Sequence, residues 1–248
     1  MSGEPWLILP TYNEAENVEA IVGAASEVLA SATASTSDGD GFAVLVVDDG
    51  SPDGTGQIAD RLAAEHDWMH VLHRAEKNGI GPAYLAGFRH ALEHGAGYVM
   101  EMDCDFSHDP ADLARLLAAV DRNSPESADL ALGSRYVPGG GVSDWGWLRR
   151  FISEGGSTYS RWVLGLHVRD LTGGFKCFRR EVLEAIDFGG VRSHGYAFQV
   201  ELTYRAVRAG FDIVEVPIVF RDRQHGTSKM SWRIAAEAMW LVPRLRFR

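Results

Sequence analysis

The sequence predicts an α/β protein built on a mainly parallel sheet that helices cover on both faces. Through the first 134 residues, short apolar runs bounded by turn residues alternate with stretches of helical periodicity, which is the element order of such a sheet. The apolar runs are nearly continuous in Val, Ile and Leu, as in strands buried on both sides. The 248 residues are 46% hydrophobic, which supplies a full core. We therefore expect one domain over 1–229, followed by a tail over 230–248.

The elements follow from where these runs begin and end. Strands are expected at 6–9, 42–48, 70–74, 98–103, 129–134, 174–178 and 213–220. Helices are expected between them, at 14–31, 56–66, 82–94, 109–122, 150–165, 180–187 and 196–209. The small polar stretch 31–41 predicts a surface loop, and the Gly-rich stretch 137–147 predicts a mobile flap.

Polar clusters follow three of the expected strands: "LPTYNEAEN", "VVDDGSPDGT" and "MDCDFSHDP". Alone, each has an ordinary explanation as a helix start, a turn or a helix cap. In open α/β sheets, however, ligands bind beyond the carboxyl ends of the strands. Three such clusters on one edge favour a ligand site.

Asp103 and Asp105 indicate a metal within that site. In an extended segment, residues i and i+2 point to the same side, about 6–7 Å apart. Two carboxylates so close repel one another unless they share a divalent cation, and oxygen ligands suit Mg²⁺ or Mn²⁺. The chain has no HExxH and no Cys/His cluster for zinc, and "KNGIGPAYLAGF" lacks the ending of a P-loop.

The charge distribution points to a local anionic partner. The net charge of −10 argues against nucleic acid, but from Arg221 onward seven Lys/Arg stand against two Asp/Glu. Arg223 and Lys229 follow the last strand, and Arg135 and Arg149 lie earlier in the chain. Such side chains bind phosphate oxygens, in pairs for arginine and as a point charge for lysine.

The sequence also bears on location. Two cysteines without a pairing pattern indicate a reducing compartment, and no signal peptide or bilayer-spanning run is evident. The tail places Met230, Ile234, Ala238 and Leu241 on one helical stripe with a basic end. This pattern is typical of a helix in a membrane interface or of a helix that packs on the core. We expect a cytoplasmic protein, peripheral at the cytoplasmic face of a membrane.

In order and spacing, six segments resemble the polyprenol- or dolichol-phosphate mannosyl synthases, which are inverting family 2 glycosyltransferases. They are "LPTYNEAENV", "VVDDGSPDGTG", "MDCDFSHDP", "GSRY", "DLTGGFKCF" and "RQHGTSK". The resemblance covers nearly the whole chain. It implies a single GT-A (Rossmann-like) domain, GDP-mannose as donor, polyprenyl or dolichyl phosphate as acceptor, and Mg²⁺ or Mn²⁺ as cofactor.

For the donor, the resemblance implies roles for residues on three strand ends. The guanosine part would be held by Pro10, Tyr12, Glu14, Val46 and Asp48. Asp103, Cys104 and Asp105 would lie at the ribose, the diphosphate and the metal. Asp105 would be the main metal ligand, with Asp103 and Ser107 as the other candidates; relatives often carry glutamine at the Ser107 position and alanine at Cys104. Arg223 and Lys229 would hold the diphosphate.

For the acceptor, Arg135, Arg149 and Ser153 match positions that would receive the lipid phosphate. Asp170 and Thr172 match a motif near the acceptor. A phosphate monoester is largely ionised at neutral pH, so it needs positioning more than a general base. A single displacement would give a β-linked mannosyl phosphate. Many relatives append membrane helices, so anchoring here would come from a membrane partner subunit or from a part of a longer protein.

Three other functions remain open at this point. The first is transfer from UDP-glucose or another UDP-sugar to polyprenyl phosphate. The second is a sugar-1-phosphate nucleotidyltransferase, which usually has an N-terminal Gly-rich loop that "LPTYNEAEN" lacks. The third is a non-catalytic subunit that binds nucleotide-sugars, against which the intact acidic and basic residues argue.

Overall fold

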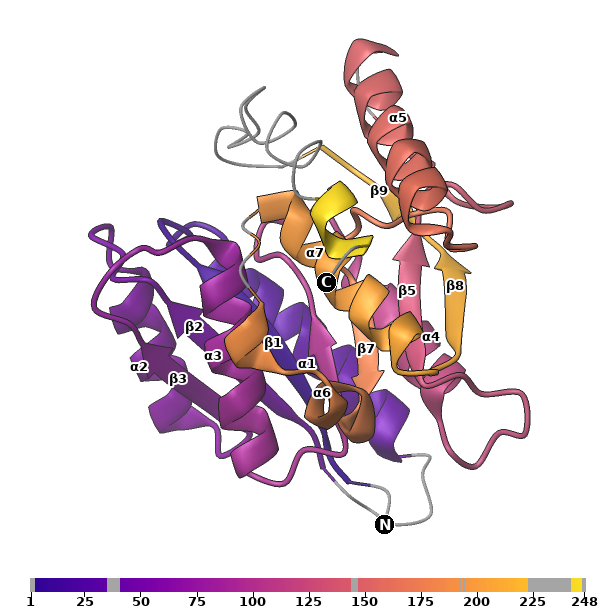
Figure 1. Cartoon of the computed structure of the whole chain (residues 1–248). Helices are drawn as coiled ribbons and strands as arrows, with labels where there is room; N and C mark the ends of the chain where they lie inside the picture. Colours follow the sequence, from indigo (N-terminus) through magenta and orange to yellow (C-terminus); the bar gives the residue numbers. More distant parts are fainter. Residues whose placement is uncertain are drawn as a thin grey trace.

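The chain forms a mixed α/β structure around one large sheet, as the sequence predicts (Figure 1). This computed structural model describes residues 3–34, 41–143, 147–191, 193, 195–222 and 242–246. The sheet has seven strands in the order β3-β2-β1-β4-β7-β5-β8. They are β1 (Pro5–Thr11), β2 (Ala43–Asp48), β3 (Met69–His73), β4 (Tyr98–Glu101), β5 (Leu130–Ser134), β7 (Lys176–Arg179) and β8 (Ile213–Pro217). Adjacent strands are parallel except at β7, which is antiparallel to both β4 and β5.

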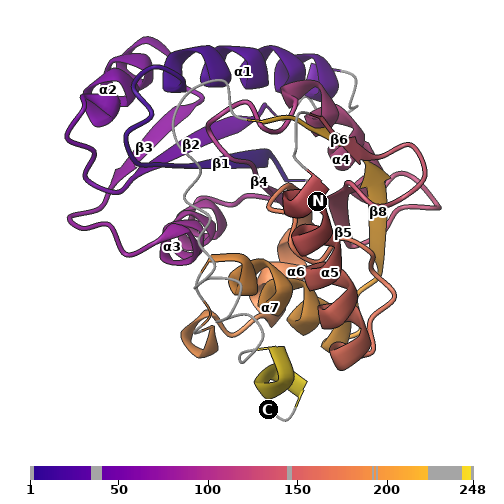
Figure 2. The same ribbon diagram turned by 90° about the horizontal axis from the view of Figure 1, so that it is seen from above.

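Helices cover both faces of the sheet (Figure 2). They are α1 (Val18–Ala34), α2 (Thr55–Glu65), α3 (Ile80–Glu93), α4 (Leu113–Val120), α5 (Trp147–Leu164), α6 (Arg180–Ala185) and α7 (Gly195–Arg208). Helices α1, α2 and α4 contribute to the core on one face, and α3, α6 and α7 contribute to the core on the other. Short 3-10 turns lie at Pro110–Asp112 and Phe188–Gly190. Buried strand residues contribute to both cores, which explains the continuous apolar runs.

Helix α3 lies unusually close to the sheet because of Gly87. A Cβ at this position would lie 2.5 Å from Cγ2 of Ile8 on β1. Any side chain here would displace the helix from the strand, which explains a glycine in the middle of a helix. The close approach fixes α3 against the strands whose ends form the site.

The pattern of strands differs from the sequence-based expectation in two segments. The expected strand 213–220 is two strands, β8 and β9 (Val219–Phe220). Between them, the amide of Ile218 donates to the carbonyl of Ser134. The expected flap contains a strand, β6 (Gly141–Val142), that pairs with β9. Paired strands this short give little local signal in a sequence.

The described end of the tail packs on the core. Val242 and Leu245 are buried in a cluster with Leu164 of α5, and Nη1 of Arg246 donates to the carbonyl of Val163, 2.6 Å away. Of the two alternatives for the tail, a helix in a membrane interface or a helix that packs on the core, residues 242–246 therefore follow the second. The stripe residues Met230, Ile234, Ala238 and Leu241 lie outside the described residues. Across the part of the chain that the structure describes, no helix has both the length and the apolar content to cross a membrane.

Three histidines gather around Trp6, at the start of β1. His70 stacks on the Trp6 ring at 4.7 Å, and His90 and His94 stack on one another at 4.1 Å. Burial lowers the pKa of His70 and of His90, and the neighbouring histidines lower both further. The carboxylate of Glu93 partly offsets this by raising the pKa of His90. The cluster therefore favours neutral imidazoles.

This cluster predicts a pH-dependent stability. In the folded state, the pKa of His70 and of His90 lies below the ordinary histidine value of 6.5. Their contribution is thus complete above that pH and is lost as the pH falls, because the unfolded chain takes up protons first. Between about pH 7.5 and about pH 5.5, we expect the Tm of the wild type to fall more than that of His70→Gln. The exposed His167 gives the control, His167→Gln, which should retain the wild-type slope; equal slopes in all three proteins would contradict the prediction.

Candidate active site

The polar clusters meet at one edge of the sheet, where β1, β2, β4 and β5 end. Because β7 runs antiparallel to β4 and β5, its first residue, rather than its last, lies at this edge. The segment that precedes β7, which carries Asp170 and Thr172, is thereby brought to the same edge. The parallel pairing of β8 with β5 brings the chain after Pro217 there as well.

The turns after β1 and β2 hold one another in place. Asp53 accepts hydrogen bonds from the amide of Ala15 at 3.1 Å and from the hydroxyl of Thr55 at 2.6 Å. The hydroxyl of Thr55 in turn accepts from the amide of Glu14 at 2.9 Å. These bonds outweigh burial and lower the pKa of Asp53. The Asp53-Gly54-Thr55 segment is thus a turn itself and also holds the first turn in place through these hydrogen bonds.

Asp48, at the end of β2, is buried and hydrogen-bonded. Its carboxylate accepts from the Thr11 hydroxyl at 3.3 Å and from the amide of Ser51 at 3.2 Å. The Ser51 hydroxyl donates to it as well. Asp48 is therefore held in a fixed orientation at the edge of the sheet.

The acidic turn after β4 has a strained backbone. Phe106 has φ of 58°, a left-handed conformation that is unfavourable for a bulky residue and costs about 1–3 kcal/mol. On either side of it, Asp105 and Ser107 are buried, and Oδ1 of Asp105 accepts the amide of Ser107 at 3.0 Å. Asp103 is half-buried. The left-handed conformation of Phe106 places Asp105 and Ser107 on one tight turn. The local sequence does not predict this conformation.

Negative charge is concentrated around this turn. The pKa of the buried Tyr84 is raised well above its usual value by burial first, and then by Asp103, Glu101 and Asp105. The pKa of Cys104 is raised by burial and then by Glu14 and the same aspartates. Carboxylates of the first and third clusters therefore both act on Cys104. The acidic turn is therefore a suitable site for a cation.

One cation of the protein lies beneath the turn, fully buried. Lys176, the first residue of β7, donates to Glu101 at 3.1 Å and to Gln199 on α7. Burial lowers the pKa of Lys176, while Glu101 and Asp170 raise it. Lys176 therefore links the end of β4 with helix α7.

A second buried ion pair lies on the other side of the sheet edge. Arg135 donates through Nε and Nη2 to the two oxygens of Asp170, each at 2.7 Å, and Nη2 also donates to Thr172 at 2.8 Å. Burial would raise the pKa of Asp170, but Arg135 outweighs it and lowers that pKa. The Tyr136 hydroxyl donates to Ser153 on α5 at 2.7 Å. Arg135, Ser153 and the Asp170 motif are thus brought together, although they are far apart in the sequence.

His108 lies between the two halves of the site. Its ring contacts Phe175 at 4.9 Å and Phe220 at 5.1 Å. Burial lowers the pKa of His108 to about 4, while Asp105 acts in the opposite direction. The neutral ring joins the acidic turn to the strand β9.

The basic segment starts beside the acidic turn. The amide of Arg221 donates to the carbonyl of Ser107 at 3.0 Å, and its guanidinium lies 3.3 Å from the carboxylate of Asp109. Arg223 and Lys229 themselves lie outside the described residues. So does the side chain of Arg149, whose backbone is in α5.

The remaining nucleotide candidates are on β1, β2 and the first turn. Pro10 is half-buried at the end of β1, and Val46 is fully buried in the core below the edge. Tyr12 has a neighbour that sequence reasoning missed: Nζ of Lys77 lies 3.6 Å from the centre of its ring. Lys77 is the first residue of "KNGIGPAYLAGF", the segment that lacks the ending of a P-loop.

The acidic turn has donors suited to a hard divalent cation. The Ser107 hydroxyl is buried and finds no hydrogen-bond partner among the described residues, and it is on the same turn as Asp105. Within those residues no three His, Cys, Asp or Glu side chains converge as a complete metal site. An ion held here takes few protein ligands, as Mg²⁺ does in sites where substrate phosphates complete the coordination.

A mainly parallel sheet with an acidic turn at its carboxyl edge, and with the buried ion pair of Arg135 and Asp170 at the same edge, is the architecture of a glycosyltransferase of the GT-A fold. Residues 6–187 match the sequence family described as glycosyl transferase family 2, and the chain belongs to that family. It is 51% identical over 237 residues to a polyprenol monophosphomannose synthase of Mycolicibacterium smegmatis, covering 95% of this chain and 84% of the relative. It is 47% identical over 237 residues to an undecaprenyl-phosphate mannosyltransferase of Micrococcus luteus, covering 96% and 91%.

Solved structures share the fold at lower identity. A glucosyl-3-phosphoglycerate synthase from Mycobacterium tuberculosis, in complex with phosphoglyceric acid, superposes with a TM-score of 0.66 at 16% identity, covering 99% of this chain and 80% of that one. A mannosyltransferase from Pyrobaculum calidifontis, in complex with GDP-Man and Mn²⁺, superposes with a TM-score of 0.63 at 21% identity, covering 98% and 65%. Both confirm the GT-A architecture of this chain.

Proposed function

We propose that this glycosyltransferase moves a mannosyl group from GDP-mannose to the phosphate of a polyprenyl phosphate. The observation that carries the proposal is the identity of about half the residues, over nearly the whole chain, with two mannosyltransferases named for polyprenol and undecaprenyl-phosphate. The arrangement of the carboxyl edge of the sheet agrees with this proposal. An acidic turn suits a metal-bound nucleoside diphosphate, and a buried arginine suits a second phosphate.

The donor occupies the side formed by β1, β2 and β4. Pro10, Tyr12, Glu14 and Asp48 bind the guanosine part, with Val46 contributing the buried floor. Asp103 and Cys104 adjoin the ribose and diphosphate, which Arg223 and Lys229 hold from the far side. A divalent ion, Mg²⁺ or Mn²⁺, fits Asp105, with Asp103 and Ser107 as further ligands. When bound, it supplies charge neutralisation for the departing diphosphate.

The acceptor occupies the side formed by β5, α5 and the segment before β7. Arg135, Arg149 and Ser153 position the lipid phosphate, and Asp170 and Thr172 hold Arg135. A phosphate oxygen forms the new bond to C1 of mannose, while the bond from C1 to the diphosphate breaks and GDP leaves with the electron pair. Because attack and departure occur on opposite faces, the α-linked donor gives a β-linked product. The phosphate is already ionised, so these residues need only position it.

The acceptor also determines where the enzyme works. A polyprenyl chain stays in the bilayer and leaves only its phosphate at the surface, so the enzyme acts peripherally, at the cytoplasmic face where nucleotide sugars are available. A membrane-anchoring partner subunit would fit the same arrangement. In this proposal the catalytic domain comprises residues 1–229, and residues 230–248 form a tail whose described end, 242–246, packs on that domain.

The test is transfer from labelled GDP-mannose to polyprenyl phosphate in vesicles with Mg²⁺ or Mn²⁺, with UDP-glucose in parallel. We expect a charged mannolipid that mild acid cleaves, formed from GDP-mannose and suppressed by a chelator. A clear preference for UDP-glucose would overturn the donor. Binding of nucleotide sugar without transfer to any lipid phosphate would favour the non-catalytic alternative.

A further inference from the structure

Helix α5 exposes apolar side chains on the face that points away from the core. Trp162 is 82% exposed and Ile152 is 45% exposed. With the exposed Gly155 between them, they lie at intervals of three and seven residues, which places them on one stripe of a helix. We call Ile152, Gly155 and Trp162 the outer stripe; the half-buried Tyr159 beside it packs against the cluster that contains Val242 and Leu245. An indole this exposed is unusual for a surface that meets only water.

The opposite side of α5 belongs to the acceptor site. Ser153, Ser157 and Ser160 are buried. The Ser153 hydroxyl accepts from Tyr136, and that of Ser157 lies 3.4 Å from the hydroxyl of Thr172, which Arg135 contacts. Ile152 and Ser153 are adjacent in the sequence, so the outer stripe begins next to the proposed phosphate site. Helix α5 itself projects beyond the rest of the molecule (Figure 1).

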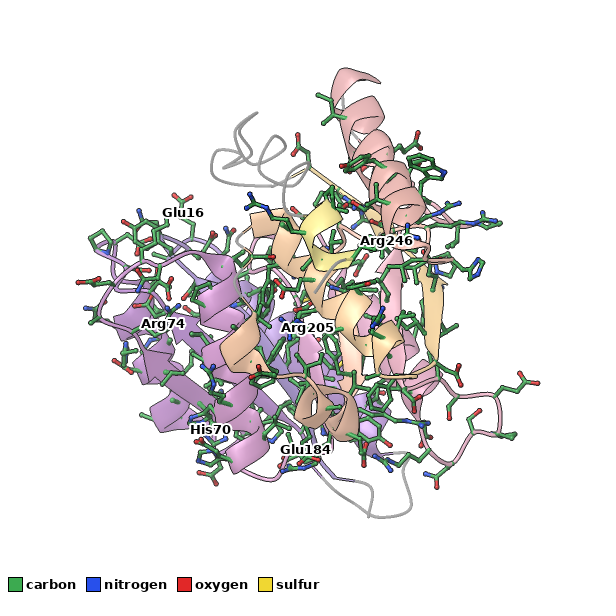
Figure 3. The ribbon with its side chains drawn as sticks, in the orientation of Figure 1. Glu16, His70, Arg74, Glu184, Arg205 and Arg246 are labelled. Carbon is green, nitrogen blue, oxygen red and sulfur yellow. The ribbon has the colours of Figure 1, made fainter. Side chains whose placement is uncertain are left out.

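Basic residues lie around the last turn of α5 in a protein that is acidic overall. Arg169, Arg244 and Arg246 are exposed and Arg161 is half-buried. Arg246 lies beside α5 (Figure 3) and donates to the carbonyl of Val163. Two carboxylates share the region. Glu215 accepts the amides of Arg169 and Asp170, and Glu154 is half-buried on α5.

We propose that the outer stripe of α5 docks on the surface of an anionic bilayer, with Trp162 at the level of the lipid headgroups. The inference rests on the proposed function, because a lipid acceptor requires its phosphate site to face a membrane. Tryptophan is favoured at that interface, where one side of its ring is apolar and its N–H meets water. The flanking arginines complement anionic headgroups. Because Ser153 is adjacent to Ile152, the docked helix brings the proposed phosphate site close to the bilayer surface.

The experiment measures cosedimentation of the full chain with vesicles, without nucleotide sugar or acceptor. The vesicles are of phosphatidylcholine alone or of equal parts phosphatidylcholine and phosphatidylglycerol. We expect Trp162→Ser to lower the partition coefficient by about tenfold or more on both. Arg169→Gln should lower it by about fivefold on the anionic vesicles only. Val214→Ser, at a residue that is 36% exposed on β8, is the matched control and should bind like the wild type.

A second readout separates docking from chemistry. With geranyl phosphate in solution, Trp162→Ser should retain the wild-type kcat and KM. With polyprenyl phosphate in vesicles, its apparent KM for the acceptor should rise. Wild-type protein that does not bind vesicles, or equal binding by Trp162→Ser and Val214→Ser, would overturn the docking surface. The docking surface would also be overturned if Trp162→Ser changed only the self-association measured by ultracentrifugation. In that case the outer stripe would be an interface between two copies of the protein. Vesicle binding that depends on Trp162, without any mannosyl transfer, would overturn the proposed function and leave the docking surface standing.

Discussion

Replacing Asp105 by asparagine is expected to lower kcat/KM for mannosyl transfer by about 10³-fold, because several kcal/mol of charge stabilisation on the diphosphate depend on a bound cation. Asparagine retains an oxygen that can accept the amide of Ser107, which Asp105 accepts at 3.0 Å. It also removes one negative charge from a turn where carboxylates lie close together. The free energy of unfolding should therefore be unchanged or higher. Initial rates at several metal concentrations and a denaturant titration measure the two effects.

Asp112→Asn is the matched control for Asp105→Asn. Asp112 lies in the 3-10 turn that follows the acidic turn and pairs with the exposed Arg115 at 2.6 Å. Its loss should leave transfer at the wild-type rate, since Asp112 lies outside the proposed metal ligands and an ion pair with an exposed arginine contributes little. If Asp105→Asn transfers mannose as fast as Asp112→Asn does, the cation is bound elsewhere and our assignment of the turn is wrong.

Replacing Asp170 by asparagine is expected to be costly in both stability and rate. Asp170 is fully buried and compensates the charge of Arg135 through two bonds of 2.7 Å. Removing one partner of a buried pair costs about 3–5 kcal/mol, because the other charge is left uncompensated. Arg135 would also lose its orientation toward the lipid phosphate, and we expect transfer to fall by about 10²-fold or more. Chemical denaturation and the KM for polyprenyl phosphate are the measurements.

A double replacement separates the structural role of this pair from its role in transfer. In Arg135→Met with Asp170→Leu, neither charge of this pair remains, and most of the lost stability should return. Transfer should stay low, because no guanidinium is left to meet the phosphate, while the binding of GDP-mannose should be close to that of the wild type. Recovery of transfer together with stability would show that Arg135 has only a structural role.

The sequence predicted the large elements well because they depend on local patterns. Each strand of the large sheet lies within a residue or two of an apolar run, except for the shortened ends of 98–103 and 213–220. The first helix begins at Val18 and not at residue 14. The amides of Asn13, Glu14 and Ala15 donate instead to side chains of the neighbouring turn. Those partners are some forty residues away, so no local pattern contains them.

By itself, the sequence determined the α/β class and the family, and it supplied the residue types at the strand ends. The tertiary structure decided which of those residues meet. The alternation of side chains along a strand is the same in both directions, so nothing local states that β7 runs antiparallel. That direction brings Asp170 to Arg135 and places Lys176 opposite Glu101 on the neighbouring strand. The left-handed backbone at Phe106 is likewise a result of packing, because it costs free energy that only the surrounding fold supplies.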